Sequence, residues 1–161
     1  MIPKELDIDI YDFAAYIAKL CAMKNYFVNL TKLQKLIYCV YGAVLVYSDT
    51  RICKEHPKRY PHGHVFPKLY NFAKKHHFDF INTLLNRKEN VESNLTDPQI
   101  KVINAVIGFF GKYNAGELVA WSQHPNGAWY KSGNMSQISD DLIIEYFKTL
   151  IKKVSYVVKV Y

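Results

Sequence analysis

The chain has 161 residues, of which 50% are hydrophobic and 22% are charged, a composition that excludes an intrinsically disordered protein. The Lys and Arg residues outnumber the Asp and Glu residues, 21 to 14, and the resulting net charge of +7 permits an acidic partner. The length predicts one domain over residues 1–161. The apolar stretch Leu36–Tyr47 is shorter than the roughly 18 residues of a membrane span, and three widely spaced cysteines predict a reducing compartment, the cytoplasm.

Two helices are predicted in the first third of the chain. Asp9 can cap the first, whose apolar residues recur at helical spacing from Ile10 to Cys21, and Asn25 is expected to end it. The second is expected to begin at Thr31, with a glutamine three positions later in capping-box geometry. Its apolar stripe predicts one buried face. Three polar residues are expected on the opposite side: Lys32, Gln34 and Lys35.

The middle of the chain is predicted to be less regular. Proline, glycine and basic residues break the pattern over residues 48–66, which predicts a structured loop with up to two short strands. Pro67 is placed to open a third helix that ends near Lys75. Residues 76–85 have a mixed periodicity, which leaves their conformation undetermined.

Three more helices are predicted in the last third. Thr96 begins the first of them with a capping box that Gln99 completes. A short helix over residues 116–123 and a polar turn over residues 124–135 follow, and the last helix is expected over residues 140–153.

The C-terminal tail is the last segment to assign, and the fold class follows from all the predicted elements. Residues 156–161 could extend the last helix or form an edge strand, and their β-branched side chains favour the strand. The expected fold class is therefore mainly α: a compact domain of about five or six helices, with at most a minor β element around residues 50–66 and in the C-terminal tail.

Four potential metal ligands lie within twelve residues: Cys53, His56, His62 and His64. Their spacing matches no paired zinc signature, so we expect neither a metal nor a cofactor. Cys21 and Cys39 lie on or beside apolar stripes and are expected in the core. Cys53 is expected to be accessible and would be the nucleophile of a Cys–His hydrolase. Because the chain lacks a Gly-rich phosphate loop and a Gly-x-Ser-x-Gly turn, we expect no enzymatic activity.

The positive charge is concentrated in the middle of the chain. Residues 26–90 hold 11 basic and 4 acidic residues, a surplus equal to the net charge of the whole chain. Solvated lysines on helix surfaces would explain this surplus, and so would a basic face that binds nucleic acid. A nucleic-acid-binding regulator is therefore the alternative function.

Three sequence blocks together resemble a known family. They are residues 30–38 (LTKLQKLIY), residues 59–70 (RYPHGHVFPKLY) and residues 117–124 (ELVAWSQH), the last followed by Trp129. In this order the blocks are similar to the Panacea domain, the family of SocA-like antitoxins and phage-associated GepA-like proteins. The chain departs from the family pattern at His64 and Ala128, where proline is usual.

This resemblance implies a non-enzymatic protein that binds and neutralises a toxin encoded beside it. In some relatives the domain acts as an adaptor that presents the toxin to a bacterial AAA+ protease. Two roles stay open for the tryptophans and the histidine of the third block, a surface anchor or a small cluster that closes the domain. The positions that the blocks imply for partner binding are Gln34, Lys35, Tyr38, Tyr60, His62, Gly63, His64, Tyr70, Trp121, His124 and Trp129.

Overall fold

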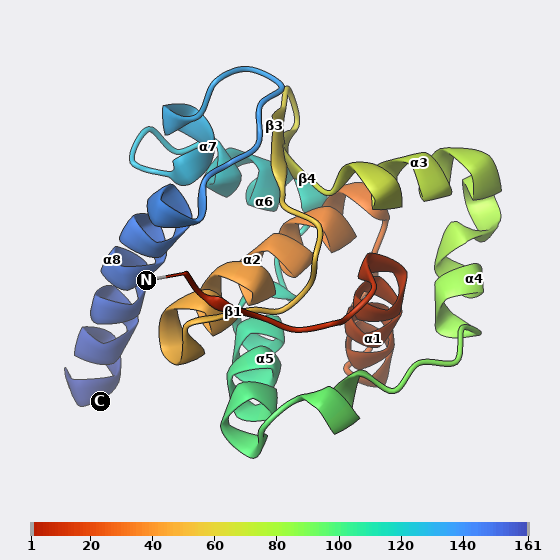
Figure 1. Cartoon of the computed structure of the whole chain (residues 1–161), viewed down its shortest axis with the longest axis horizontal. Helices are drawn as coiled ribbons and strands as arrows, with labels where there is room; N and C mark the ends of the chain where they lie inside the picture. Colours follow the sequence, from red (N-terminus) through yellow and green to blue (C-terminus); the bar gives the residue numbers. More distant parts are fainter. Residues whose placement is uncertain (1, 161) are drawn as a thin grey trace.

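The computed structural model describes residues 2–160, and the side chains of residues 2–150 (Figure 1). Two strand pairs accompany the helices: β1 (Lys4–Glu5) is parallel to β2 (Thr50–Arg51), and β3 (Lys58–Tyr60) forms an antiparallel hairpin with β4 (Gly63–Val65). The mainly α fold class is confirmed, and no described helix is both long and apolar enough to cross a membrane. The α-helices are α1 (Ile10–Met23), α2 (Leu30–Ser48), α3 (Pro67–His76), α4 (Phe80–Leu85), α5 (Asp97–Phe110), α6 (Ala115–Ser122), α7 (Ala128–Lys131) and α8 (Asp140–Val160).

Helix α2 lies at the centre of the fold (Figure 1). It contacts α1, α5, α6, α8 and β4, and every residue from Lys32 to Leu45 is buried. A helix that is covered on all sides has no solvent-facing stripe, even where its sequence is polar. The prediction that Lys32, Gln34 and Lys35 lie on an exposed side is therefore wrong. Each of these side chains needs a polar partner inside the protein.

Local capping signals determine most of the helix starts. Asp9 accepts a hydrogen bond from the backbone N–H two residues later at 2.7 Å, and both bonds of the predicted capping box at the start of α5 are formed. Helix α2 differs from its prediction, because Asn29 rather than Thr31 caps it by accepting the backbone N–H of Lys32 at 2.9 Å. The side chain of Gln34 is therefore available for a contact outside its own helix.

The structure corrects the prediction for the C-terminal tail and adds detail to two other segments. The backbone stays helical to Val160, so the edge strand expected in the C-terminal tail is wrong for the described residues 156–160. Once a helix is nucleated, each further residue adds a hydrogen bond at little cost, which outweighs a weak strand preference. The turn predicted over residues 124–135 contains α7, and residues 77–85 form a 3₁₀ turn followed by α4.

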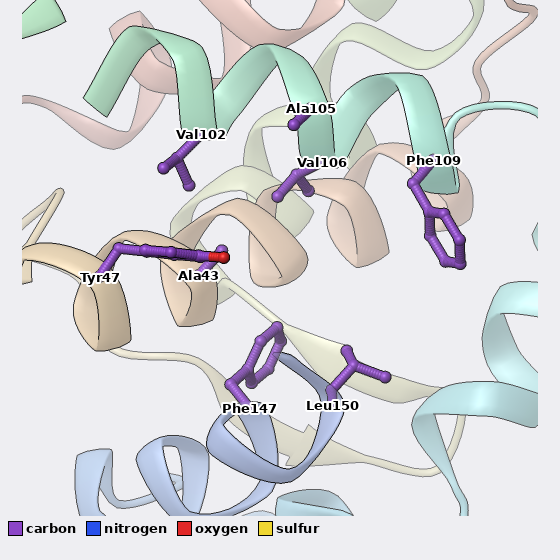
Figure 2. Close-up of a pocket in the computed structure, with 8 residues that line it drawn as sticks. All are labelled: Ala43, Tyr47, Val102, Ala105, Val106, Phe109, Phe147 and Leu150. Atoms are coloured by element: carbon purple, nitrogen blue, oxygen red, sulfur yellow. The ribbon is translucent and has the colours of Figure 1, made fainter. Parts of the chain in front are cut away.

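Helix α8 packs against α2 through Phe147. The ring lies against Gly42, where any added side chain would clash with it. Beside this contact, α2, α5 and α8 leave an apolar groove of about 250 Å³, and Figure 2 shows Tyr47, Phe109 and Leu150 among its walls. None of the groove's lining residues belongs to the three sequence blocks.

An ion-pair network holds the start of α8 against the rest of the fold. The Asp140 carboxylate accepts hydrogen bonds from the Arg51 guanidinium at 2.5 Å and from the Tyr41 hydroxyl at 2.7 Å. Arg51 also donates to Glu5 at 2.7 Å. The network therefore joins β1, β2, α2 and α8, which are far apart in the sequence.

Candidate functional site

The three sequence blocks meet at the β3–β4 hairpin. The first block forms the start of α2, the second forms the hairpin and the beginning of α3, and the third forms most of α6. Strand β4 contacts both α2 and α6, so segments that are distant in the sequence lie side by side (Figure 1). The candidate site is this junction and the surface around it.

Gln34 attaches α2 to the end of β4. Its Oε1 accepts the backbone N–H of Phe66 at 2.9 Å, and its Nε2 donates to the Phe66 carbonyl at 3.3 Å. Phe66 is the N-cap residue of α3 and has no side chain that caps the helix. The buried amide of Gln34 therefore pairs with the main chain much as a neighbouring strand would, and it does not take the capping role at Thr31 that its spacing predicted.

Lys35 and Gly63 form a second junction. The Lys35 ammonium donates to the carbonyl of His64 at 3.0 Å, and burial of this residue, which is 1% exposed, lowers its pKa to about 8. Gly63 has a φ of 112°, a conformation that other residues rarely adopt. A Cβ there would lie 2.5 Å from both Lys35 Cε and Ser122 Oγ, so β4 can approach α2 and α6 this closely only with glycine at position 63.

His64 is buried beside this junction. Its ring stacks on Tyr38 with the ring centroids 3.3 Å apart and the planes 12° apart. Neither ring nitrogen has a hydrogen-bond partner among the described residues. Burial, together with the charge of Lys35, holds the pKa of His64 well below its usual value, so the ring is neutral.

The buried His64 predicts a loss of stability in acid. Because the folded state keeps His64 neutral while the unfolded state takes up a proton below pH about 6.5, the free energy of unfolding should fall by about 1.4 kcal/mol per pH unit as the pH decreases from 6.5. His56, whose pKa burial also lowers, contributes in the same direction. His64→Leu should remove one histidine's share of this slope, measured by urea unfolding between pH 5 and pH 7. An unchanged slope would contradict the neutral, buried state of His64.

The four side chains considered as metal ligands do not come together. Cys53 is buried in the hydrophobic core, contrary to its prediction, and burial raises the pKa of its thiol. His62 is exposed, His64 is buried, and His56 lies 3.8 Å from Asp140. In the described residues, no three His, Cys, Asp or Glu side chains are grouped so that they could hold a metal ion. The geometry gives no support to a hydrolase centred on Cys53.

Five of the implied positions are not buried and lie in the hairpin, contact it or directly follow a residue that contacts it, and we call them together the hairpin face. The Trp129 indole N–H donates to the Tyr60 carbonyl at 2.7 Å, and the Tyr60 and Tyr70 rings meet edge to face with centroids 5.7 Å apart. These three side chains are half-buried, whereas both histidines of the face are exposed. The members of the hairpin face are Tyr60, His62, Tyr70, His124 and Trp129.

Two further residues hold the hairpin face together, and sequence reasoning did not single them out. The Arg59 guanidinium lies 4.2 Å from the centre of the Trp129 ring and donates to the carbonyl of Ser132. Gln123 donates to the Pro61 carbonyl at 2.7 Å. The partners of both residues are far away in the sequence, so no local pattern indicates these contacts. The only signal in the sequence is that Arg59 and Gln123 lie within the blocks.

Trp121 is half-buried and belongs to an aromatic cluster at the edge of the core rather than to the hairpin face. Its ring centroid lies 5.0 Å from that of Phe110, 6.2 Å from that of Tyr38 and 6.3 Å from that of Phe147. Of the two roles that the sequence left open for this tryptophan, the geometry favours the cluster that closes the domain.

These contacts define a class of protein, a helical domain in which buried polar side chains hold a β-hairpin at the surface. The chain belongs to the family described as antitoxin SocA-like, Panacea domain, whose match covers residues 33–130, more than half of the chain. The match runs from the first block to the residue after Trp129, and it confirms the resemblance. Neither a curated protein nor a solved structure gives a significant match.

Proposed function

We propose that the chain is the antitoxin of a toxin–antitoxin pair and that it neutralises its toxin by binding it directly, without turnover. The observation that carries this proposal is the family match over residues 33–130, which contains the hairpin and both junctions that hold it. Toxin and antitoxin then act as a stoichiometric complex.

The hairpin face is the proposed contact surface. Five of the eleven implied positions are buried, so they support the partner-binding surface without touching the partner: Gln34, Lys35, Tyr38, Gly63 and His64. Of the remaining six, Trp121 lies in the aromatic cluster, and the other five form the hairpin face. Half-buried aromatic rings with a cation stacked on one of them match the composition of interface hot spots.

Co-expression tests this function. The product of the neighbouring gene, expressed alone, should stop growth, and co-expression of this chain should restore it through a complex that survives gel filtration. A neighbour that is harmless, or growth that is restored without a complex, would argue against direct neutralisation.

Trp129→Ala measures the contribution of the hairpin face. We expect it to weaken toxin binding by about 2 kcal/mol, or roughly thirty-fold in Kd, because tryptophan at an interface centre is often a hot spot. Tyr47→Ala is the matched control, since Tyr47 is an exposed aromatic residue outside the face. Calorimetry on the purified complex gives both values, and thermal unfolding shows whether each variant is folded. If Trp129→Ala and Tyr47→Ala bound the toxin with equal affinity, the toxin would not contact the hairpin face.

The nucleic-acid alternative gains little from the structure. Of the eleven basic residues between positions 26 and 90, Lys32 and Lys35 are buried, and Arg51, Lys54 and Arg87 form ion pairs with Glu5, Asp140 or other carboxylates. Part of the positive charge of this region is therefore buried or paired with carboxylates of the same chain, which favours a protein partner. A gel-shift assay at low salt is the direct test, because counterion release would make such binding steeply salt-dependent.

Delivery of the bound toxin to a bacterial AAA+ protease is a further step that the family permits. It predicts that the toxin level on an immunoblot falls faster after a translation block when the antitoxin is present. If the co-expressing strain grew while the toxin level stayed constant, the antitoxin would neutralise the toxin by binding alone, without delivery to a protease.

A further inference from the structure

The turn between α1 and α2 and the turn between α5 and α6 enclose a polar hollow of about 510 Å³. Its walls belong to residues 25–32 and 111–116, and they include two lysines, Lys32 and Lys112, and three asparagines. No aspartate or glutamate of the described chain lines it. Two cations therefore border a space without an acidic side chain.

The charge of Lys32 is buried, and its contacts are a carbonyl and the Tyr26 ring, whose centre lies 5.7 Å from the ammonium. The residue is 7% exposed, and its ammonium donates to the Gly111 carbonyl at 2.6 Å. None of the ion pairs within the described residues includes it. The neighbouring Cys21 is not a counter-charge at neutral pH, because burial raises the pKa of its thiol to about 11. Buried cations are normally paired, so an anion from outside would stabilise this arrangement.

The backbone adds to the positive potential. Helices α2 and α6 both begin at the hollow, with Asn29 and Asn114 as their N-cap residues. Helix N-termini carry a partial positive charge that attracts anions. Asn29 and Asn114 each accept one backbone N–H of the first turn, and in α6 the Glu117 carboxylate accepts the backbone N–H of Asn114, so the part of the N-terminal potential without an acidic partner lies at α2. The first turn of α2 nevertheless holds Lys32 and no acidic residue, the reverse of what the helix dipole favours. A bound anion would remove this conflict and would pair with the charge of Lys32.

We propose that the hollow binds an oxyanion, either a carboxylate carried by the toxin or a free phosphate. The first source rests on the proposed function, and the second does not. Lys32 supplies the buried charge, and Lys112, whose ammonium lies 5.3 Å from the centre of the Phe109 ring, supplies a second charge at the rim. Phe27, which is 80% exposed on the wall of the hollow, offers an apolar contact beside the anion.

The binding experiment uses the full chain and two probes, sodium phosphate and N-acetylglutamate, titrated at constant ionic strength against a chloride background. Backbone amide signals of residues 30–32 and 115–117 should shift and saturate with at least one probe. Absence of saturation with both probes would overturn the proposal.

Two variants and a control make the assignment specific. At Gly116 an added Cβ meets only Asn114 Oδ1, at 3.4 Å, so Gly116→Glu can place a carboxylate in the hollow and should abolish probe binding. Lys112→Gln, an exposed substitution, should weaken binding three- to ten-fold. Lys148→Gln removes the same charge from α8 and should leave binding unchanged. If all three variants lost probe affinity equally, the change in net charge would explain the loss, and the proposed site would be wrong.

Co-expression of Gly116→Glu with the toxin distinguishes the two sources. Loss of both probe binding and neutralisation assigns the anion to the toxin, whereas loss of probe binding alone assigns it to a free phosphate. The parent chain in the same assay tests the proposed function separately, because a parent that fails to neutralise leaves the probe titrations intact.

Discussion

Alanine at position 63 is expected to lower the free energy of unfolding by about 3 kcal/mol, since two independent penalties meet at Gly63. The first is conformational, because a φ of 112° is accessible to glycine and strained for alanine. The second is steric, because the new Cβ would lie 2.5 Å from Lys35 Cε and Ser122 Oγ, both held in the interior. Relief of the clash would move β4 away from α2 and weaken the bond from Lys35 to the His64 carbonyl.

Gly108→Ala is the matched control for this prediction. Gly108 lies inside α5, and a Cβ there meets no atom within 4 Å, so alanine should raise the free energy of unfolding by about 0.5–1 kcal/mol. Urea unfolding of the two variants and the parent gives both values. If Gly63→Ala were as stable as the parent, the close approach of β4 to α2 would be incorrect.

Signals that act over a few residues predicted the fold well. Capping by Asp9, the capping box at Thr96 and the start of α3 at Pro67 depend on neighbours within one turn, and all three are confirmed. The tail is an instructive exception, because its weak strand preference is a property of single residues and helix propagation from α8 overrides it.

The interior of the site could not be predicted in the same way. Helical periodicity assigns polar residues to an outer face, yet Gln34 and Lys35 are buried because α2 is covered on every side. Their partners are the main chain at Phe66 and His64, about thirty positions away, and no local pattern specifies such a contact. The sequence blocks propose candidate residues, and only the packing shows that Tyr60, Tyr70 and Trp129 are in contact with one another at the hairpin.

The buried amide of Gln34 leads to the second large effect. Gln34→Met keeps the length of the side chain but removes both bonds to Phe66, and it should lower the free energy of unfolding by about 2 kcal/mol. Most of this loss arises at the Phe66 N–H, which would be left buried and unpaired. The Phe66 carbonyl keeps a second bond, because it also accepts the backbone N–H of Tyr70 at 3.1 Å.

Gln34→Ala adds a cavity to the lost hydrogen bonds and should therefore be less stable than Gln34→Met by a further 1–2 kcal/mol or so. Gln123→Ala is the control, because that amide donates to the Pro61 carbonyl in an exposed position and its loss should cost less than about 1 kcal/mol. Hydrogen exchange adds a local readout, since the Phe66 amide should lose protection in both Gln34 variants and keep it in Gln123→Ala. If the Phe66 amide stayed protected in Gln34→Met, Gln34 would not be the group that attaches α2 to the hairpin. The attachment of the hairpin to α2 would then depend on Lys35 and Gly63.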